Sequence, residues 1–145
     1  MDIQVKKLRP NAVMPTRGSA AAAGYDLYAC LEERVVSPPH ATVPVGTGLA
    51  MAFAEGWFAA IFARSGLASK KGLRPANCVG VCDADYRGEY IVALHNDGGE
   101  PRTVEPGERI AQMVLLPCQD LAFRETEELP ATERGAGGFG STGTK

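Results

Sequence analysis

The chain has 145 residues, of which 45% are hydrophobic and 22% are charged, and its formal net charge is −2. This length fits one ordinary domain with a substantial core, and the average composition excludes wholesale disorder. The 17 Gly and 10 Pro are too many for a helical bundle, and no apolar run approaches the roughly 18 residues that a membrane span needs. The balanced charge argues against stable nucleic-acid binding.

Short apolar or alternating runs, bounded by turn residues, predict many β-strands. One short helix is predicted at 65–71, with Ser65 placed to cap it. Many short strands at even spacing favour an all-β sandwich or a jelly-roll-like β-barrel. In chain order the predicted strands are 3–8, 25–30, 34–36, 41–45, 48–53, 57–62, 78–83, 89–96, 102–104, 109–116 and 119–123.

The last part of the chain differs in composition, being first charged and then rich in glycine. We therefore divide the chain into a β-barrel domain, 1–125, and a C-terminal arm, 126–145, that is expected to be mobile. Backbone N–H groups freed by glycine, hydroxyls and a guanidinium suit phosphate oxygens, and an aromatic ring suits stacking. A plain disordered terminus is the alternative from composition. The side chains concerned are Arg134, Phe139, Ser141 and Thr142.

The four cysteines do not predict a metal site or a disulfide framework. Cys78 and Cys82 are close in sequence, but no second close pair and no nearby His completes a zinc set. The length supplies enough core without disulfides. Free, mostly buried thiols are expected, in a reducing, cytoplasmic compartment and with no membrane attachment.

Asp26 lies in the apolar segment 23–29, where an unpaired carboxylate would cost several kcal/mol. Two interpretations remain open. One is a structural salt bridge to Arg17 or Arg34, and the other is contact with the water shell of a bound metal ion.

The segment 63–69 places Arg64, Ser65 and Gly66 at the end of a predicted strand. Charge, hydroxyl and accessible N–H in succession are typical of an anion site. A surface ion pair with a serine helix cap is the alternative.

The segment 77–92 has two predicted strands around DYRG and is interpreted as a β-hairpin. Asp83 and Asp85 would share one face of an alternating strand. Because a like-charged neighbour raises a carboxyl pKa, one of them is a candidate general base. An Asp-rich surface turn is the alternative. Candidates for ligand contact on this segment are Asn77, Gly80 and Tyr86.

The segment 106–113 combines a Pro-Gly turn with Arg109 and Gln112 on the following strand. Residues three apart on a strand point to opposite faces. Gln112, among apolar neighbours, needs a buried partner, which is either a ligand phosphate or a neighbouring carbonyl.

Five segments together resemble the five motifs of the homotrimeric dUTPases: AGYDLYA, ARSGLAS, VGVCDADYRGE, PGERIAQM and RGAGGFGSTG. The match runs from Ala23 to Gly143, and Cys82, where the family usually has Ile or Val, is the one departure. The resemblance implies a jelly-roll subunit and a homotrimer with shared active sites. The C-terminal arm would close over the active site of a neighbouring subunit.

The resemblance also implies Mg²⁺-dependent hydrolysis of dUTP to dUMP and pyrophosphate by water attack on the α-phosphorus. Such an enzyme keeps uracil out of DNA and supplies dUMP for thymidylate synthesis. Asp83 would be the general base, Asp26 would hold Mg²⁺ through water, and Tyr86 would reject ribonucleotides. Arg64, Ser65 and Gln112 would complete the catalytic set. Implied substrate contacts are Arg64, Ser65, Gly66, Asn77, Gly80, Val81, Asp83, Tyr86, Gln112, Arg134, Phe139, Gly140, Ser141 and Thr142.

Two other functions are compatible with the same fold. A dCTP deaminase would need a catalytic Glu where this chain offers Asp83. A nucleotide-sensing regulatory binder would not need the catalytic set that Asp26, Asp83 and Gln112 complete. A purely structural trimer would leave the glycine-rich arm unexplained.

Overall fold

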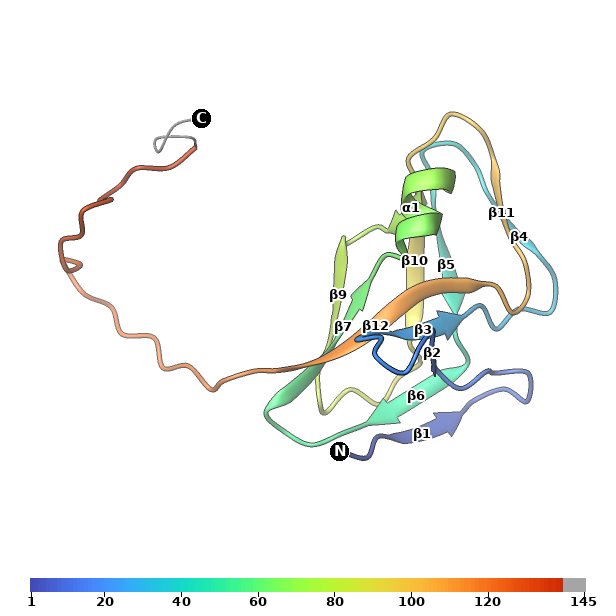
Figure 1. The fold of residues 1–145 in the computed structure, drawn as a ribbon, viewed down its shortest axis with the longest axis horizontal. Helices are drawn as coiled ribbons and strands as arrows, with labels where there is room; N and C mark the ends of the chain where they lie inside the picture. The colour runs from blue at the N-terminus through green and yellow to red at the C-terminus, as the bar shows by residue number, and fades with distance from the viewer. Residues whose placement is uncertain (140–145) are drawn as a thin grey trace.

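The computed structural model describes residues 1–139 and shows a mostly β chain with one short helix (Figure 1). The predicted helix at 65–71 is confirmed. The elements are β1 (Gln4–Lys7), β2 (Thr16–Arg17), β3 (Tyr25–Tyr28), β4 (Val35–Ser37), β5 (Thr42–Gly46), β6 (Leu49–Ala52), β7 (Trp57–Phe62), α1 (Ser65–Lys71), β8 (Leu73–Pro75), β9 (Val79–Cys82), β10 (Ile91–Asn96), β11 (Arg102–Val104) and β12 (Arg109–Pro117).

Every strand pair is antiparallel, and strands distant in sequence are neighbours. The largest sheet has the order β2-β3-β12-β7-β9, and a second has the order β5-β10-β8. Two-stranded pairs form between β1 and β6 and between β4 and β11. The jelly-roll-like all-β fold is confirmed, although the sheets do not close into a barrel among the described residues.

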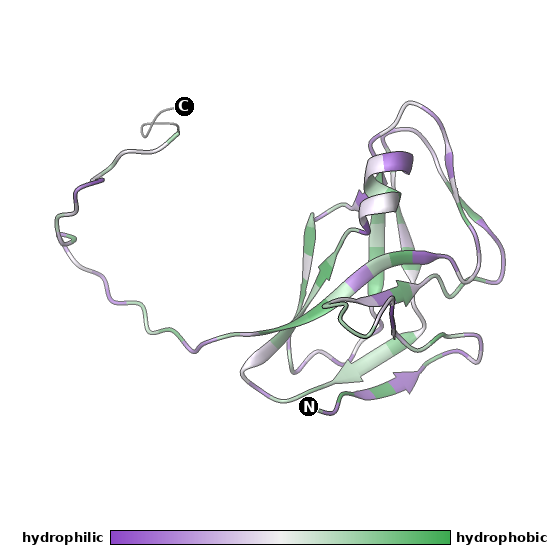
Figure 2. Ribbon diagram, in the orientation of Figure 1, coloured by the Kyte–Doolittle hydropathy of each residue, from purple (hydrophilic) through white to green (hydrophobic). Residues whose placement is uncertain are grey.

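The core lies where these sheets face one another. Leu27, Leu49, Leu94 and Val104 come from four different sheets, and each is at most 1% exposed. Each buried leucine contributes about 2 kcal/mol relative to an exposed one. Figure 2 shows β7 and β9 as largely hydrophobic and β1 as largely hydrophilic, as expected when β1 lies at the outside. Because all the sheets contribute to one core, they hold in place the loops that carry the polar segments.

The predicted capping of the helix is wrong. Arg64, not Ser65, is the N-cap residue, and its side chain makes no capping hydrogen bond. The helix ends at Lys71 and is capped by Gly72. The φ of 68° at Gly72 is accessible to glycine at little cost, and the Gly72 N–H donates to Ala68 O and Leu67 O. The Ser65 hydroxyl therefore does not cap the helix.

The predicted hairpin over 77–92 is also wrong. β9 pairs with β7, whereas β10 pairs with β5 and β8 in the other sheet. The chain between them crosses from one sheet to the other instead of turning back. Its far end is held by Tyr90, whose backbone N–H donates to Leu49 O at 2.8 Å.

The chain leaves the folded body after Pro117 (Figure 1). The strand predicted at 119–123 is wrong for the single chain, because 118–139 contains no strand. Leu121, Phe123 and Leu129 are 64%, 93% and 83% exposed. This segment contributes no residue to the core of its own chain.

All four cysteines are free, as predicted, but the expectation that most are buried is wrong: only Cys30 is buried, and Cys78 and Cys118 are exposed. Within residues 1–139 no helix is long and apolar enough to cross a membrane.

Candidate functional site

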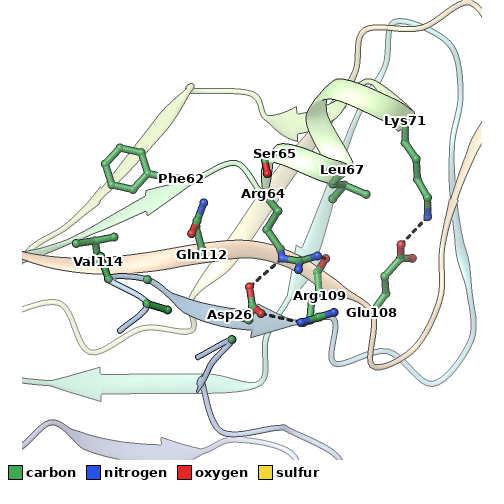
Figure 3. A pocket seen from close by; sticks show the side chains of 15 residues that line it. Asp26, Phe62, Arg64, Ser65, Leu67, Lys71, Glu108, Arg109, Gln112 and Val114 are labelled. Carbon is green, nitrogen blue, oxygen red and sulfur yellow. Dashed lines mark hydrogen bonds and ion pairs between the residues drawn. The ribbon is translucent and has the colours of Figure 1, made fainter. Parts of the chain in front are cut away.

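The first cavity, here called the Asp26 pocket, has a volume of about 580 Å³ and lies between β3, β12 and the start of α1 (Figure 3). It brings together six residues that the sequence singled out. These come from three of the polar segments, and they are Asp26, Arg64, Ser65, Gly66, Arg109 and Gln112.

Asp26 is only 9% exposed and holds two arginines. Its Oδ1 accepts from Arg64 Nε at 2.8 Å, and its Oδ2 accepts from Arg109 Nη1 at 3.1 Å. The predicted partners Arg17 and Arg34 are therefore wrong. Arg17 instead donates to Ala22 O at 2.8 Å. Asp26 pairs with Arg109 because β3 and β12 are neighbouring strands, and local sequence does not reveal which strands are neighbours.

Arg109 and Gln112 both line the Asp26 pocket, which contradicts the prediction that they point to opposite faces. The register against β3 shifts between Arg109 and Ala111, so a bulge breaks the strict alternation. The Gln112 amide donates to Ala63 O at 2.9 Å. Its buried partner is thus a neighbouring carbonyl, and this bond fixes the side chain at the cavity wall.

Lys71 and Glu108, which sequence analysis missed, form an ion pair at the edge of the same pocket, with Nζ and Oε1 2.8 Å apart. Burial of the Glu108 carboxyl raises its pKa, but hydrogen bonds from Lys71 and from the Glu105 N–H outweigh burial, and the net pKa is lowered. The basic last turn of α1 was the available sequence signal for Lys71. No local signal marks its partner.

The charged groups of the Asp26 pocket do not balance. Three cations, Arg64, Lys71 and Arg109, face two carboxylates, Asp26 and Glu108. A cavity with one excess positive charge attracts anions and raises their local concentration. Together with the uncommitted Ser65 hydroxyl, this arrangement suits a phosphate group.

The second cavity, here called the Tyr86 pocket, has a volume of about 280 Å³ beside β9 and the loop that follows it. Tyr86 donates its hydroxyl to Glu89 O at 3.0 Å. The Glu89 carboxylate in turn accepts from Gly48 N at 2.7 Å and pairs with Arg9, which fixes the loop. The sequence-predicted residues that line this pocket are Asn77, Gly80, Val81, Asp83 and Tyr86.

Asp83 lies just beyond the end of β9 and lines the Tyr86 pocket, whereas Asp85 lines neither of these pockets. The two carboxylates do not share a strand face as predicted, because the strand ends at Cys82. Gly80 packs closely against β7, since a Cβ there would lie 3.1 Å from Ile61 Cβ.

Cys82 lies in the wall of the Tyr86 pocket next to Tyr90. Burial raises the pKa of the Cys82 thiol above its usual value. Burial likewise raises the pKa of the Tyr90 hydroxyl. Both groups are neutral near pH 7, so Cys82 acts as a small apolar side chain rather than a nucleophile.

The two pockets have no lining residue in common, and within residues 1–139 no hydrogen bond or ion pair joins Asp83 to the Asp26 pocket. The segment after Pro117 extends away from the body (Figure 1), and Arg134 and Phe139 belong to this segment by their position in the sequence. Arg134 donates to Gly137 O at 2.9 Å, and Phe139 is fully exposed. Gly140, Ser141 and Thr142 lie outside the described residues.

Comparison with known proteins identifies the family. The family model for dUTPase matches residues 10–143. The chain belongs to the dUTPase family. It is 44% identical over 144 residues to the deoxyuridine 5'-triphosphate nucleotidohydrolase of Bordetella pertussis, covering 99% of this chain and 97% of that protein. It is 46% identical over 146 residues to the corresponding protein of Neisseria meningitidis serogroup A, with 99% and 97% covered.

A solved structure of a dUTPase supports the same assignment. The Staphylococcus bacteriophage 80alpha dUTPase with dUPNHPP superposes with a TM-score of 0.89 and 31% identity, covering 99% of each chain. The matched region of this dUTPase family member includes both pockets and most of the C-terminal arm.

The Asp26 pocket fits Mg²⁺ held through water. Within the described part of the chain no three His, Cys, Asp or Glu gather into a metal cage. Each Asp26 oxygen accepts one arginine, and a carboxylate has about four acceptor sites, so sites remain for water. Mg²⁺ usually keeps several waters and binds one or two carboxylates plus substrate phosphates. One carboxylate beside a cavity whose positive charge attracts phosphates matches that pattern, since the phosphates would supply the remaining negative charge.

Gly24 lies against the Gln112 side chain, so that a Cβ at this position would displace the Gln112 amide. A Cβ at Gly24 would lie 2.6 Å from Gln112 Oε1 and 3.4 Å from Gln112 Cβ. We expect Gly24→Ala to displace the amide and to lower kcat/KM for dUTP by up to about 10²-fold, the cost of a misplacement of about 1 Å. Steady-state pyrophosphate release measures this.

The control for that prediction is Gly99→Ala, because a Cβ at Gly99 meets nothing within 4 Å. It should leave kcat/KM unchanged. If Gly24→Ala has the same kcat/KM as wild type, the prediction is wrong, because the Gln112 side chain then adjusts to the added Cβ without a loss of activity.

Proposed function

We propose that this member of the dUTPase family hydrolyses dUTP to dUMP and pyrophosphate with Mg²⁺, by attack of water on the α-phosphorus. The observation that carries the proposal is the pair of cavities. One has an excess positive charge for phosphates, and the other combines a nucleoside-sized volume with Asp83 and Tyr86 at its wall.

The phosphate chain would bind in the Asp26 pocket. Arg64 supplies a guanidinium, Ser65 a hydroxyl and Gly66 a backbone N–H in the first turn of α1, where N–H groups have no acceptor within the helix. Gln112 is oriented by its bond to Ala63 O and supplies an amide dipole. Fixed donors stabilise the charge that develops as the bond from the α-phosphorus to the bridging oxygen breaks. Asp26 would hold Mg²⁺ through water, and the ion would supply positive charge that offsets the negative charge of the phosphates.

The nucleoside would bind in the Tyr86 pocket. The Asn77 amide and the backbone groups of Gly80 and Val81 supply the donors and acceptors that the uracil edge requires. A mismatched donor–acceptor order rejects cytosine by about 10⁴-fold or more. The Tyr86 ring, held by its hydroxyl bond to Glu89 O, would pack against the deoxyribose and exclude a 2′-hydroxyl.

Asp83 is the proposed general base. It is an exposed carboxylate that can accept a proton from water at the wall of the nucleoside cavity. The water oxygen bonds to the α-phosphorus, its proton passes to Asp83 and pyrophosphate leaves. A positioned general base typically contributes about 10²–10⁴-fold to the rate.

We further propose a homotrimer with shared active sites. Two features support it: the pockets of one chain share no residue, and the described segment 118–139 contributes no residue to the core of its own chain. In an assembly the Tyr86 pocket of one subunit would meet the Asp26 pocket of another, and the C-terminal arm would close over both. The four free thiols are in keeping with the proposed cytoplasmic location.

A product assay tests the function. With Mg²⁺ we expect pyrophosphate release from dUTP and little from dCTP, dTTP or UTP, and chelation should abolish it. Ammonia release from dCTP would indicate a deaminase. Binding of dUTP without turnover in the presence of Mg²⁺ would indicate a regulatory binder. Light scattering of the same sample should give three chains per particle.

A further inference from the structure

The turn that connects β8 to β9 has an unusual backbone and carries Asn77. Cys78 has a φ of 63°, a left-handed conformation that a residue with a side chain adopts at a cost. Its N–H donates to Pro75 O at 3.0 Å, and the Val79 N–H donates to Asn77 O at 2.7 Å. Because Asn77 lies inside this turn, the turn conformation decides where the Asn77 amide points within the Tyr86 pocket.

Arg74, on β8, binds this turn directly. Its Nη1 donates to Pro75 O at 3.2 Å and to Ala76 O at 3.5 Å, and lies 3.8 Å from Cys78 Sγ. One guanidinium nitrogen thus contacts three of the four residues that form the turn. Such contacts restrain the backbone against relaxation to a less strained conformation.

The other edge of the same guanidinium is anchored by Asp97. Arg74 Nε donates to Asp97 Oδ2 at 2.7 Å, and Nη2 donates to Oδ1 at 2.9 Å. This bidentate geometry fixes the plane of the guanidinium, which a lysine cannot reproduce. The Asp97 backbone N–H donates to Gly72 O at 2.9 Å, so the anchor is itself attached to the end of α1.

We propose that Arg74, anchored by Asp97, is a positioning residue for nucleobase recognition. It holds the turn at 75–78 so that Asn77 presents its amide to the base. This inference rests on the proposed function. Neither Arg74 nor Asp97 lines the Tyr86 pocket, and both lie outside the five motif segments. They act on the nucleobase only through Asn77.

The test separates the nucleoside half of the site from the phosphate half. We expect Arg74→Ala to raise KM for dUTP about tenfold and to weaken dUMP binding equally. The value of kcat and the affinity for pyrophosphate should change less than threefold, because the Asp26 pocket is untouched. Arg74→Lys keeps the charge but loses the fork, so it should resemble Arg74→Ala. Arg34→Ala is the matched control and should match wild type, because Arg34 is exposed and its side chain makes no hydrogen bond to any of residues 1–139.

A second variant distinguishes positioning from simple stabilisation. Cys78→Gly removes the strain at φ 63°, so the melting temperature should hold or rise, yet KM should increase because the turn is freed. If Arg74→Ala and Cys78→Gly both leave KM and dUMP affinity unchanged, the inference is wrong, even if Arg74→Ala lowers the melting temperature. If wild-type protein neither binds dUMP nor hydrolyses dUTP, the proposed function fails, and this inference falls with it.

Discussion

Asp83→Asn should lower kcat for dUTP hydrolysis by about 10² or more, the usual contribution of a positioned general base. Asparagine has nearly the same shape but cannot take the proton of the attacking water. Since Asp83 follows the end of β9, whose backbone stays intact, nucleoside binding should be retained. Steady-state pyrophosphate release gives kcat, and calorimetric titration with dUMP gives the affinity.

The neighbouring carboxylate supplies a matched control for this experiment. Asp85 is exposed and lines neither the Asp26 pocket nor the Tyr86 pocket, so Asp85→Asn should keep wild-type turnover. Unchanged kcat in Asp83→Asn would remove Asp83 from its proposed role. An equal loss in both variants would indicate a general effect of negative charge on this loop.

Local sequence predicted most of the strands and the helix because alternation and turn chemistry are local properties. The helix at 65–71 and strand β7 at 57–62 were predicted with the observed bounds. The hairpin over 77–92 failed for a different reason. Both of its strands are real, but each pairs with a strand more distant in sequence, and pairing is a property of the whole fold.

In the candidate site, too, local features were predicted from the sequence and contacts between distant segments were not. Segment composition identified Asp26, Arg64 and Gln112, and the structure places all three in one cavity. The partners of Asp26 could not be found, because Arg109 is 83 residues away along the chain. The bulge between Arg109 and Ala111, which brings Arg109 to the same cavity, breaks the period-2 rule on which the prediction rested.

The residues themselves also did not predict that the site is divided between two cavities. Sequence patterns identify candidate residues by their chemistry, but they do not show which of these residues lie together in one folded chain. Only the folded chain shows that Asp83 and Asp26 line different pockets. This separation gives the shared-site proposal its physical basis.

Deletion of residues 134–145 should leave the fold intact and lower kcat/KM by about 10³, the lower range for an arginine supplied in trans to a phosphoryl-transfer site. Among residues 1–139, the Arg134 side chain bonds only to Gly137 O, three residues along the chain. Phe139 contacts no core residue and is fully exposed. The melting temperature should therefore stay within 1–2 °C of wild type, roughly the effect of a surface change. A large drop in melting temperature, or an unfolded product, would mean that the C-terminal arm stabilises the fold.

Mixing two inactive variants then tests whether the C-terminal arm serves another subunit. Asp83→Asn has the arm but lacks the base, and the deletion variant has the base but lacks the arm. If base and arm reach one site from different chains, random assortment in co-refolded trimers restores about one quarter of the sites. If each arm closed over its own chain's Asp83, no mixture would contain a complete site. Recovery of activity on mixing thus supports shared sites, and its absence in trimers shown by mass spectrometry to be mixed would overturn them.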